Sequence, residues 1–240
     1  MKDFDTFQQG LGLQFNDLEL LRQAFTHRSY LNEHRGEVQG HNERLEFLGE
    51  GHNERLEFLG DAVLELISTH FLYNKYSDKP EGELTAYRAS LVNAVTCAEI
   101  AHEIGMNDFL LLSRGEAKDT GRARNILLAN AFEALVGAIY LDQGYDAAKE
   151  FITKHLFPKI DAIVREKLWQ DAKSALQEKA QESDGVTPNY SVIRETGPDH
   201  DKHFIVGVYI KEAMVAEGSG KSKQEAEQSA AREALAKKGW

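Results

Sequence analysis

The chain has one cysteine, Cys97, among its 240 residues. A single thiol excludes an internal disulfide and a cysteine-based zinc site, and it is typical of a protein kept in a reducing compartment. Long apolar runs are also missing, because the longest candidate, residues 126–141, is interrupted by Asn130 and Glu133. That makes it a poor membrane span. The opening MKDFDTFQQG lacks the apolar core of a signal peptide. We therefore expect a cytoplasmic protein with no membrane partner.

A basic surplus is absent as well. The 28 Lys and Arg side chains are outnumbered by 39 Asp and Glu side chains, which gives a net charge of −11. This balance argues against a generic basic nucleic-acid binder. The charge is uneven, since residues 1–170 carry −9 and residues 171–240 carry −2. Any chemistry based on carboxylates is therefore expected in the first part of the chain.

That first part has helical periodicity. Apolar residues recur at three- and four-residue spacings and nowhere alternate with period two, so we predict an all-α domain over residues 1–168. The polar residues 26–39 are predicted to form a loop, and residues 77–82 a turn. The predicted helices are 4–12, 17–25, the segment ending near residue 76, 83–104, 126–140, and 147–169 with a break or kink at Pro158.

The pattern changes after residue 170. Three stretches rich in Val, Ile, Tyr and Phe favour strands, and they are flanked by two predicted helices; the order is helix 173–182, strands 189–195, 203–210 and 213–218, and helix 222–237. Strands joined by short turns predict an antiparallel sheet with both helices on one face. The chain is thus predicted to be multi-domain, an all-α domain followed by an α+β domain of order α-β-β-β-α over residues 171–240.

Residues 40–61 contain a tandem repeat. The first copy is GHNERLEFLGE and the second is GHNERLEFLGD, so they differ only at Glu50 and Asp61. Each copy carries acids at positions i, i+3 and i+7, which a helix places on one face. These acids are Glu43, Glu46 and Glu50, then Glu54, Glu57 and Asp61. Such a face is most often only solvated; alternatively it binds a divalent cation, provided that more ligands come from elsewhere.

Asn130 and Glu133 are candidates for those further ligands. They lie three residues apart and are the only strongly polar side chains between Leu127 and Tyr140. Polar groups in so apolar a helix cost free energy unless they are paired or coordinated. They form either a satisfied hydrogen-bond pair or part of a metal site. With Glu57 and Asp61 they would supply four oxygen ligands, which suits Mg²⁺ or Mn²⁺.

Several motifs occur in an order that resembles one known family. They are AFTHRSY at 24–30, HNERLEFLGDAVLEL from residue 52, EGELTAYRASLV at 81–92 and the segment 114–144. Together they resemble the bacterial ribonuclease III family of double-strand-specific endoribonucleases. GPDHDKHF at 197–204 and GSGKSKQEAEQSAA at 218–231 are similar to the double-stranded-RNA-binding domain that follows in that family.

The resemblance implies a homodimer that cuts both strands of double-stranded RNA in rRNA and mRNA processing, leaving 5′-phosphate and 3′-hydroxyl ends. It implies a Mg²⁺ cofactor, replaceable by Mn²⁺, with these site residues: metal ligands Glu57, Asp61, Asn130 and Glu133, and catalytic residues Asp61, Glu133, Glu54 and Glu81. Asn130 departs from the Asp that is frequent in the family, which predicts weaker metal binding. Phe58 matches an aromatic residue that inserts into the partner subunit.

For the RNA-binding domain, the resemblance implies contacts to the minor grooves and to phosphates. The implied residues are Gln177, Glu178, Pro198, Asp199, His200, Lys221, Ser222 and Lys223. The start of the last helix also offers free N–H groups and a positive dipole end to phosphate. Gln224 stands where a second consecutive lysine is common, so we expect a modest affinity that is sensitive to salt.

The duplication leaves three hypotheses open: an active Mg²⁺-dependent endoribonuclease, a double-stranded-RNA-binding protein whose cleavage is impaired, and a metal-free structural dimer. We expect the second copy to occupy the site, because only that copy continues into AVLELISTHFL and ends in Asp61. The first copy then lengthens the helix at its N-terminal end or joins the preceding loop. In the rival register, Glu46 and Glu50 of the first copy are the ligands.

Overall fold

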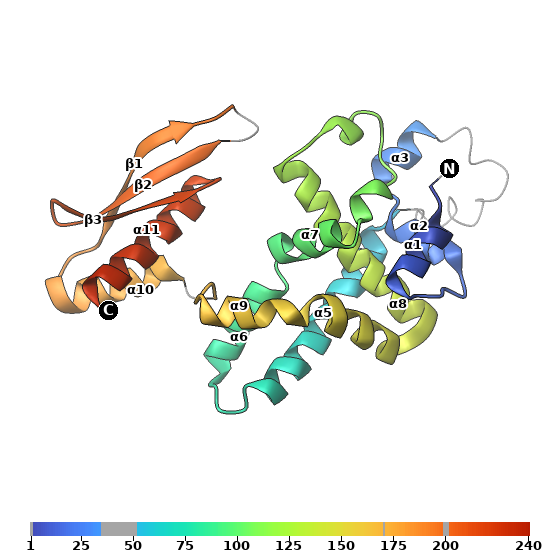
Figure 1. Ribbon diagram of the computed structural model, residues 1–240, viewed down its shortest axis with the longest axis horizontal. Helices are drawn as coiled ribbons and strands as arrows, with labels where there is room; N and C mark the ends of the chain where they lie inside the picture. Colours follow the sequence, from blue (N-terminus) through green and yellow to red (C-terminus); the bar gives the residue numbers. More distant parts are fainter. Residues whose placement is uncertain (1, 35–51, 170, 199–201) are drawn as a thin grey trace. The chain divides into compact units, whose positions relative to one another are not determined.

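The computed structural model describes residues 2–34, 52–169, 171–198 and 202–240. The chain divides into two compact units, Met1–Glu166 and Lys167–Trp240 (Figure 1). The boundary predicted from the sequence lies at residues 168–171. The first unit is built from helices and the second is a mixed α/β unit, which confirms the predicted fold class.

The helices of the first unit follow one another with short connections. They are α1 (Phe4–Leu11), α2 (Leu18–Ala24), α3 (Arg28–Glu33), α5 (Glu54–Lys75), α6 (Glu81–Leu91), α7 (Ala94–Glu103), α8 (Arg122–His155) and α9 (Ile160–Arg165), with 3₁₀ turns at Met106–Asp108, Glu116–Lys118 and Phe157–Lys159. The core forms around α8, whose residues from Leu128 to Ile139 are buried except for Asn130 and Glu133. Asn130 and Glu133 are therefore the partly exposed positions of this otherwise buried segment.

Two glycines bring α5 and α8 into direct backbone contact. A Cβ atom on Gly60 would lie 1.8 Å from the carbonyl oxygen of Glu133, and one on Gly137 would lie 2.3 Å from the carbonyl oxygen of Leu56. Real Cβ atoms do not approach this closely, so only glycine fits at either position. The crossing places Glu57 and Asp61 of α5 beside Asn130 and Glu133 of α8.

Two predictions about the helices were wrong in detail. Residues 26–39 are not entirely loop, because the His27 side chain caps the N-terminus of α3. The predicted helix 83–104 is two helices, because α6 ends at Leu91 and the Asn93 side chain caps α7 by accepting from the Thr96 N–H. The predicted division between helices 126–140 and 147–169 is confirmed by a kink inside α8 (Arg122–His155), whose backbone leaves the helical conformation at Gly144 (φ 84°). The predicted break at Pro158 coincides with the 3₁₀ turn Phe157–Lys159, which α9 follows.

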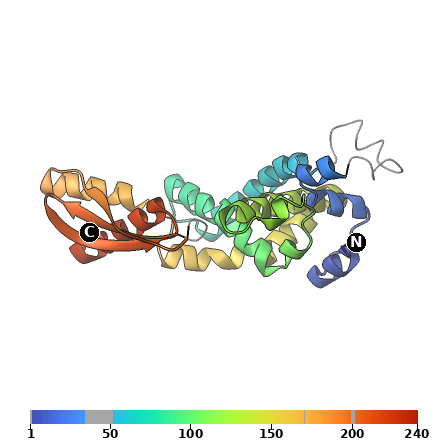
Figure 2. The ribbon, with the colours of Figure 1, turned by 90° about the horizontal axis from the view of Figure 1, so that it is seen from above.

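The second unit has the predicted order. Its elements are α10 (Ala172–Asp184), β1 (Asn189–Thr196), β2 (His203–Ile210), β3 (Ala213–Gly220) and α11 (Lys223–Lys238). The strands form an antiparallel sheet in the order β1-β2-β3. The two helices lie side by side on one face of the sheet (Figure 1 and Figure 2). The core between them is rich in small residues and includes Leu176, Ala180, Val208, Ala216, Ala230 and Ala234.

One helical stretch, residues 122–165, is long and apolar enough to cross a membrane by length and composition. The most apolar part of it has a mean hydropathy of 1.3, and 56% of that window is buried inside the protein. Such burial is the ordinary behaviour of a helix at the centre of a globular core.

Candidate active site and RNA-binding surface

The structure brings the four predicted metal ligands together. Glu57 and Asp61 lie one turn apart on α5, and Asn130 and Glu133 lie one turn apart on α8. The side chain of Asn130 is hydrogen-bonded to the Glu57 carboxylate. Both acids of α5 are close enough to Glu133 to act on its charge. The second copy of the repeat therefore provides the α5 half of the cluster.

The acids of this cluster repel one another. Burial, followed by the charges of Asp61 and Glu57, raises the pKa of Glu133 to about 7. Burial also raises the pKa of Glu57, and the charges of Glu54 and Asp61 add to this effect, while the Asn130 hydrogen bond opposes it. An opposite charge nearby would lower both pKa values. The cluster thus has the electrostatics of a cation site.

The donor set fits a hard divalent ion. Three carboxylates and one amide oxygen, completed by waters, match the preferences of Mg²⁺ and Mn²⁺. Within the described residues, no three His, Cys, Asp or Glu side chains converge closely enough to enclose a cation by themselves. The neutral oxygen of Asn130 would add a fourth ligand to the three carboxylates.

Glu54 and Glu81, the other predicted catalytic acids, have different surroundings. Glu54 is exposed in the first turn of α5, 3.6 Å from the Arg28 guanidinium and 3.8 Å from Nδ1 of His52. Its charge contributes to the raised pKa of Glu57. Glu81 begins α6, is exposed, and accepts a hydrogen bond of 3.0 Å from the Thr85 hydroxyl. Of the two, only Glu54 is among the charges that shift the pKa values of the α5–α8 acids.

Two residues beside the predicted ligands, His27 and Asn53, are not among the sites predicted from the sequence. Both line a small cavity that also borders Glu54, Glu57 and Asn130. Burial holds the pKa of His27 below its ordinary value. Asn53 is 4% exposed. The only sequence signal for these two residues is their position inside the motifs AFTHRSY and HNERLEFLGD.

Helix α5 begins inside the second copy of the repeat. The backbone N–H of Asn53 donates to the carbonyl of Thr26 at 3.0 Å, and the helix begins at Glu54. His52 and Asn53 are not helical. The predictions for the first copy, including its acids Glu43, Glu46 and Glu50, fall outside the described residues.

An apolar stripe runs along the solvent side of α5. Phe58 is 82% exposed, Leu66 60% and Tyr73 68%. Their spacings of eight and seven residues place them on one helix face. A row of large apolar side chains in water is unfavourable and marks an interaction surface.

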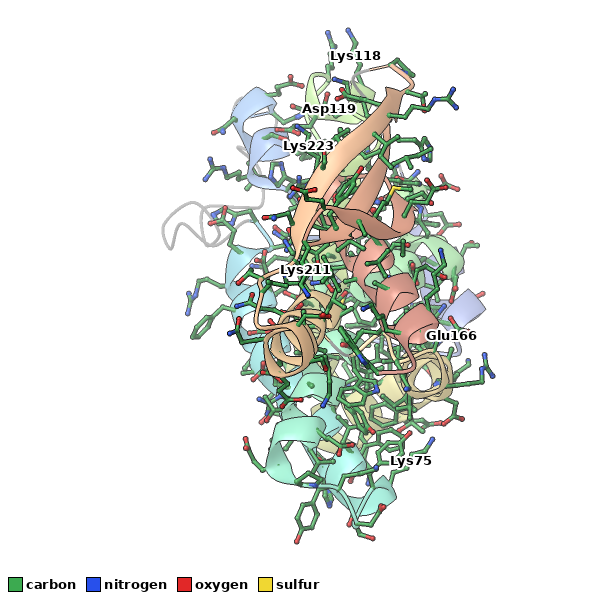
Figure 3. The ribbon with its side chains drawn as sticks, turned by 90° about the vertical axis from the view of Figure 1, so that its left-hand side faces the viewer. Lys75, Lys118, Asp119, Glu166, Lys211 and Lys223 are labelled. Atoms are coloured by element: carbon green, nitrogen blue, oxygen red, sulfur yellow. The ribbon has the colours of Figure 1, made fainter. Side chains whose placement is uncertain are left out.

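In the second unit, the predicted phosphate contacts lie at the N-terminus of α11. Ser222 caps this helix, since its hydroxyl accepts from the Glu225 N–H at 3.2 Å. Lys221 and Lys223 are exposed on either side of the cap, and Lys223 is labelled in Figure 3. The Glu225 carboxylate accepts from the backbone N–H of Lys221 at 2.8 Å. A carboxylate of the chain itself therefore competes for the positive end of the helix.

The predicted groove contacts are partly described. Gln177 and Glu178 are exposed on α10, and Pro198 is exposed after β1, while Asp199 and His200 fall outside the described residues. Two interactions fix the start of α10 against α11. Gln228 donates to the Asp171 carboxylate at 2.6 Å, and the Lys173 ammonium pairs with Glu227 at 2.5 Å. The structure thus holds the exposed face of α10 in a set position relative to the start of α11.

Comparisons with known proteins agree with both units. Residues 50–160 match the ribonuclease-III-like family, and residues 172–238 match the double-stranded RNA binding motif. The chain is 44% identical over 236 residues to Ribonuclease 3 of Bacillus licheniformis, covering 98% of this chain and 90% of the relative. It is also 44% identical to Ribonuclease 3 of Listeria welshimeri, covering 98% and 97%.

Among solved structures, the nuclease domain of ribonuclease III from Campylobacter jejuni is similar to the first unit. It is 34% identical, with a TM-score of 0.54, and the match covers 65% of this chain and 97% of that one. That structure was described for flexibility in the region involved in dimer formation. From these similarities over almost its whole length, the chain belongs to the ribonuclease III family of endoribonucleases.

Proposed function

We propose that this endoribonuclease cuts double-stranded RNA as a homodimer in a Mg²⁺-dependent reaction, with Mn²⁺ as a substitute, and leaves 5′-phosphate and 3′-hydroxyl ends. The observation that carries the proposal is the group formed by Glu57, Asp61, Asn130 and Glu133, in which the pKa of Glu133 rises to about 7. Mutually repelling carboxylates beside a neutral oxygen donor are suited to a divalent cation. Processing of rRNA and mRNA in the cytoplasm is the expected setting, and the single buried thiol of Cys97 agrees with it.

These four residues would hold the ion, which supplies an activated water and charge stabilisation at the phosphate when bound. The Asn130 side chain orients Glu57 through their hydrogen bond. Asp61 is exposed, so it leaves the site open to a phosphodiester. Glu54, held between Arg28 and His52, adds negative charge at the edge of the site. Glu81 is proposed as a further catalytic acid on the basis of its motif.

The substrate class is proposed from the second unit. Double-stranded RNA is recognised by shape, across minor grooves and the phosphates between them. The exposed face of α10 with Gln177 and Glu178, together with Lys221 and Lys223 at the start of α11, supports contacts of both kinds. The contacts proposed for Pro198 and His200 belong to the same surface.

A homodimer is supported by the apolar stripe of α5. Phe58, Leu66 and Tyr73 are far more exposed than large apolar residues usually are. We expect light scattering to give the mass of a dimer for the unsubstituted protein, and a lower mass for Phe58→Glu. Met214→Glu, at an apolar residue of the RNA-binding unit that is 52% exposed, is the matched control and should leave the mass unchanged. A monomeric mass for the unsubstituted protein would contradict the dimer.

The test of the reaction uses end-labelled duplex RNA and the matched single strands. We expect cleavage of the duplex that requires Mg²⁺ or Mn²⁺, and products whose 5′ ends are degraded by a 5′-phosphate-dependent exonuclease. Glu133→Gln should lower the rate at least ~100-fold, since it removes a charged ligand. Glu150→Gln, on an exposed later part of α8, is the control. Duplex cleavage that persists in excess chelator would refute the metal dependence.

The second candidate function is binding of double-stranded RNA without cleavage. It is favoured by Asn130, which supplies one negative charge fewer than Asp, and by the duplicated stretch. The same assay separates the two. Duplex binding in a gel-shift experiment, with no product at any Mg²⁺ or Mn²⁺ concentration, would support this candidate over the enzyme.

A further inference from the structure

A small cavity lies directly behind two of the proposed metal ligands. Its volume is about 40 Å³, and its polar wall includes His27, Asn53, Glu57 and Asn130. The rest of the wall is formed by Glu54, Phe25 and leucine residues. A water molecule needs about 10–15 Å³ of such space and two to four polar partners. The cavity therefore has the size and the polar groups to hold ordered water.

The orientation of the His27 ring follows from its neighbours. The backbone N–H of Ser29 donates to Nδ1 of His27 at 3.3 Å, so Nδ1 is an acceptor. The Ser29 hydroxyl lies 2.8 Å from the same atom, and its oxygen accepts from the Ser113 N–H at 3.1 Å, so its proton is free to point at Nδ1. The ring proton must then sit on Nε2. The polar group that His27 can offer to the cavity is consequently an N–H donor.

Asn53 is held beside His27 by the chain itself. Its backbone N–H donates to the carbonyl of Thr26, the residue before His27, at 3.0 Å. Its side chain is almost fully buried yet makes no capping hydrogen bond to α5. A buried amide has to find partners, and the side chain borders the cavity. Two donors from different segments thus adjoin the same small space as the Glu57 carboxylate.

We propose that His27 and Asn53 are positioning residues, which hold the Glu57 carboxylate and the Asn130 amide in place through a water in this cavity. The water accepts from Nε2–H of His27 and donates to the Glu57 carboxylate, while the two amides complete its partners. Hydrogen bonds that orient metal ligands in this way raise metal affinity, and their loss costs about 10- to 100-fold. This inference rests on the proposed metal site and assigns that site its supporting groups.

Two substitutions of His27 separate positioning from simple support of α3. His27→Asn places an oxygen near Nδ1 and keeps the cap, because Asn is a good N-cap residue, but it loses the donor into the cavity. His27→Gln places an amide N–H near Nε2 and keeps the donor, but it loses the cap. The expected order of Mn²⁺ affinity is therefore wild type, then Gln, then Asn, whereas capping alone predicts that Gln is worse than Asn.

The primary measurement is Mn²⁺ binding to the full-length protein by calorimetry without RNA. We expect His27→Asn and Asn53→Ala to weaken binding by about 10-fold and to raise the Mg²⁺ concentration for half-maximal cleavage equally. Duplex affinity in chelator and the thermal midpoint of His27→Asn should stay at the wild-type values. His102→Ala, an exposed histidine on α7, is the control and should change none of these quantities.

The outcomes are distinguishable. If His27→Asn binds Mn²⁺ as tightly as the wild type, or if His27→Gln is the weaker of the two, the positioning role is overturned and the metal site stands. If the unsubstituted protein binds no Mn²⁺ and cuts no duplex, the proposed function fails and this inference fails with it.

Discussion

Glu133→Gln should stabilise the metal-free protein at alkaline pH. The pKa of Glu133 lies at about 7 in the folded chain, against an ordinary value of 4.5. The folded state therefore holds its proton more tightly than the unfolded state does. Below about pH 4.5 the Glu133 carboxyl does not change the free energy of unfolding. As the pH rises from about 4.5 to about 7, its ionisation lowers this free energy, and above pH 7 the full reduction is present.

The size of the effect follows from the two pKa values. The interval between 4.5 and about 7 corresponds to roughly 3.4 kcal/mol at 1.36 kcal/mol per pH unit. The carboxyl group is only partly buried, and solvent screens its repulsion from Asp61 and Glu57, so we expect about half of this, roughly 1.5 kcal/mol. For a domain of this size that is an increase of about 3–6 °C in the thermal midpoint of Glu133→Gln at pH 8.

Scanning calorimetry in chelator at pH 5 and pH 8, at one protomer concentration, measures this difference. The increase in thermal midpoint of Glu133→Gln over the wild type should be small at pH 5 and close to its full value at pH 8. Saturating Mg²⁺ should make the wild type the more stable of the two, because only the wild type gains stability from the ion. Glu150→Gln is the control and should track the wild type at both pH values. An equal gain at pH 5 and pH 8, or a loss at pH 8, would refute the reasoning.

Three further predictions concern the register, the metal and the RNA. Glu57→Gln should lower duplex cleavage at least ~100-fold, while Glu46→Gln should leave it within about twofold; the reverse result would place the first copy in the site. Asn130→Asp should lower the Mg²⁺ concentration for half-maximal rate, because it adds a charged ligand, and an unchanged Mg²⁺ titration would contradict this. Glu225→Gln should tighten duplex binding in a gel shift and steepen its salt dependence, because a negative charge beside the Lys221 N–H is removed; equal affinity across salt concentrations would exclude such competition.

Much of the second unit could be predicted from local sequence. The strands at 189–195, 203–210 and 213–218 consist largely of residues that favour strands, and they lie within β1, β2 and β3. Helix α3 was missed because it is short and polar, and its start depends on a side chain, that of His27, acting as cap. Helix caps of this kind leave little trace in the hydrophobic pattern.

The candidate site was only partly predictable. Asn130 and Glu133 stood out because they are polar in an apolar helix, and the structure sets them beside Glu57 and Asp61. His27 did not stand out, because its role depends on a cavity lined by segments far apart in the sequence. The raised pKa of Glu133 likewise arises from burial and from charges on another helix. Neither property exists until the chain has folded.

The glycine contact between α5 and α8 has a consequence for the entropy of metal binding. Because the backbones touch at Gly60 and Gly137, no side chain lies between the helices there that could repack when an ion arrives. Adjustment would then come from the rotamers of the proposed ligands Glu57 and Asp61, each of which gives up at most about 2 kcal/mol of conformational freedom. The chain thus meets most of the ordering cost of the proposed metal centre when it folds, before any ion or RNA is bound.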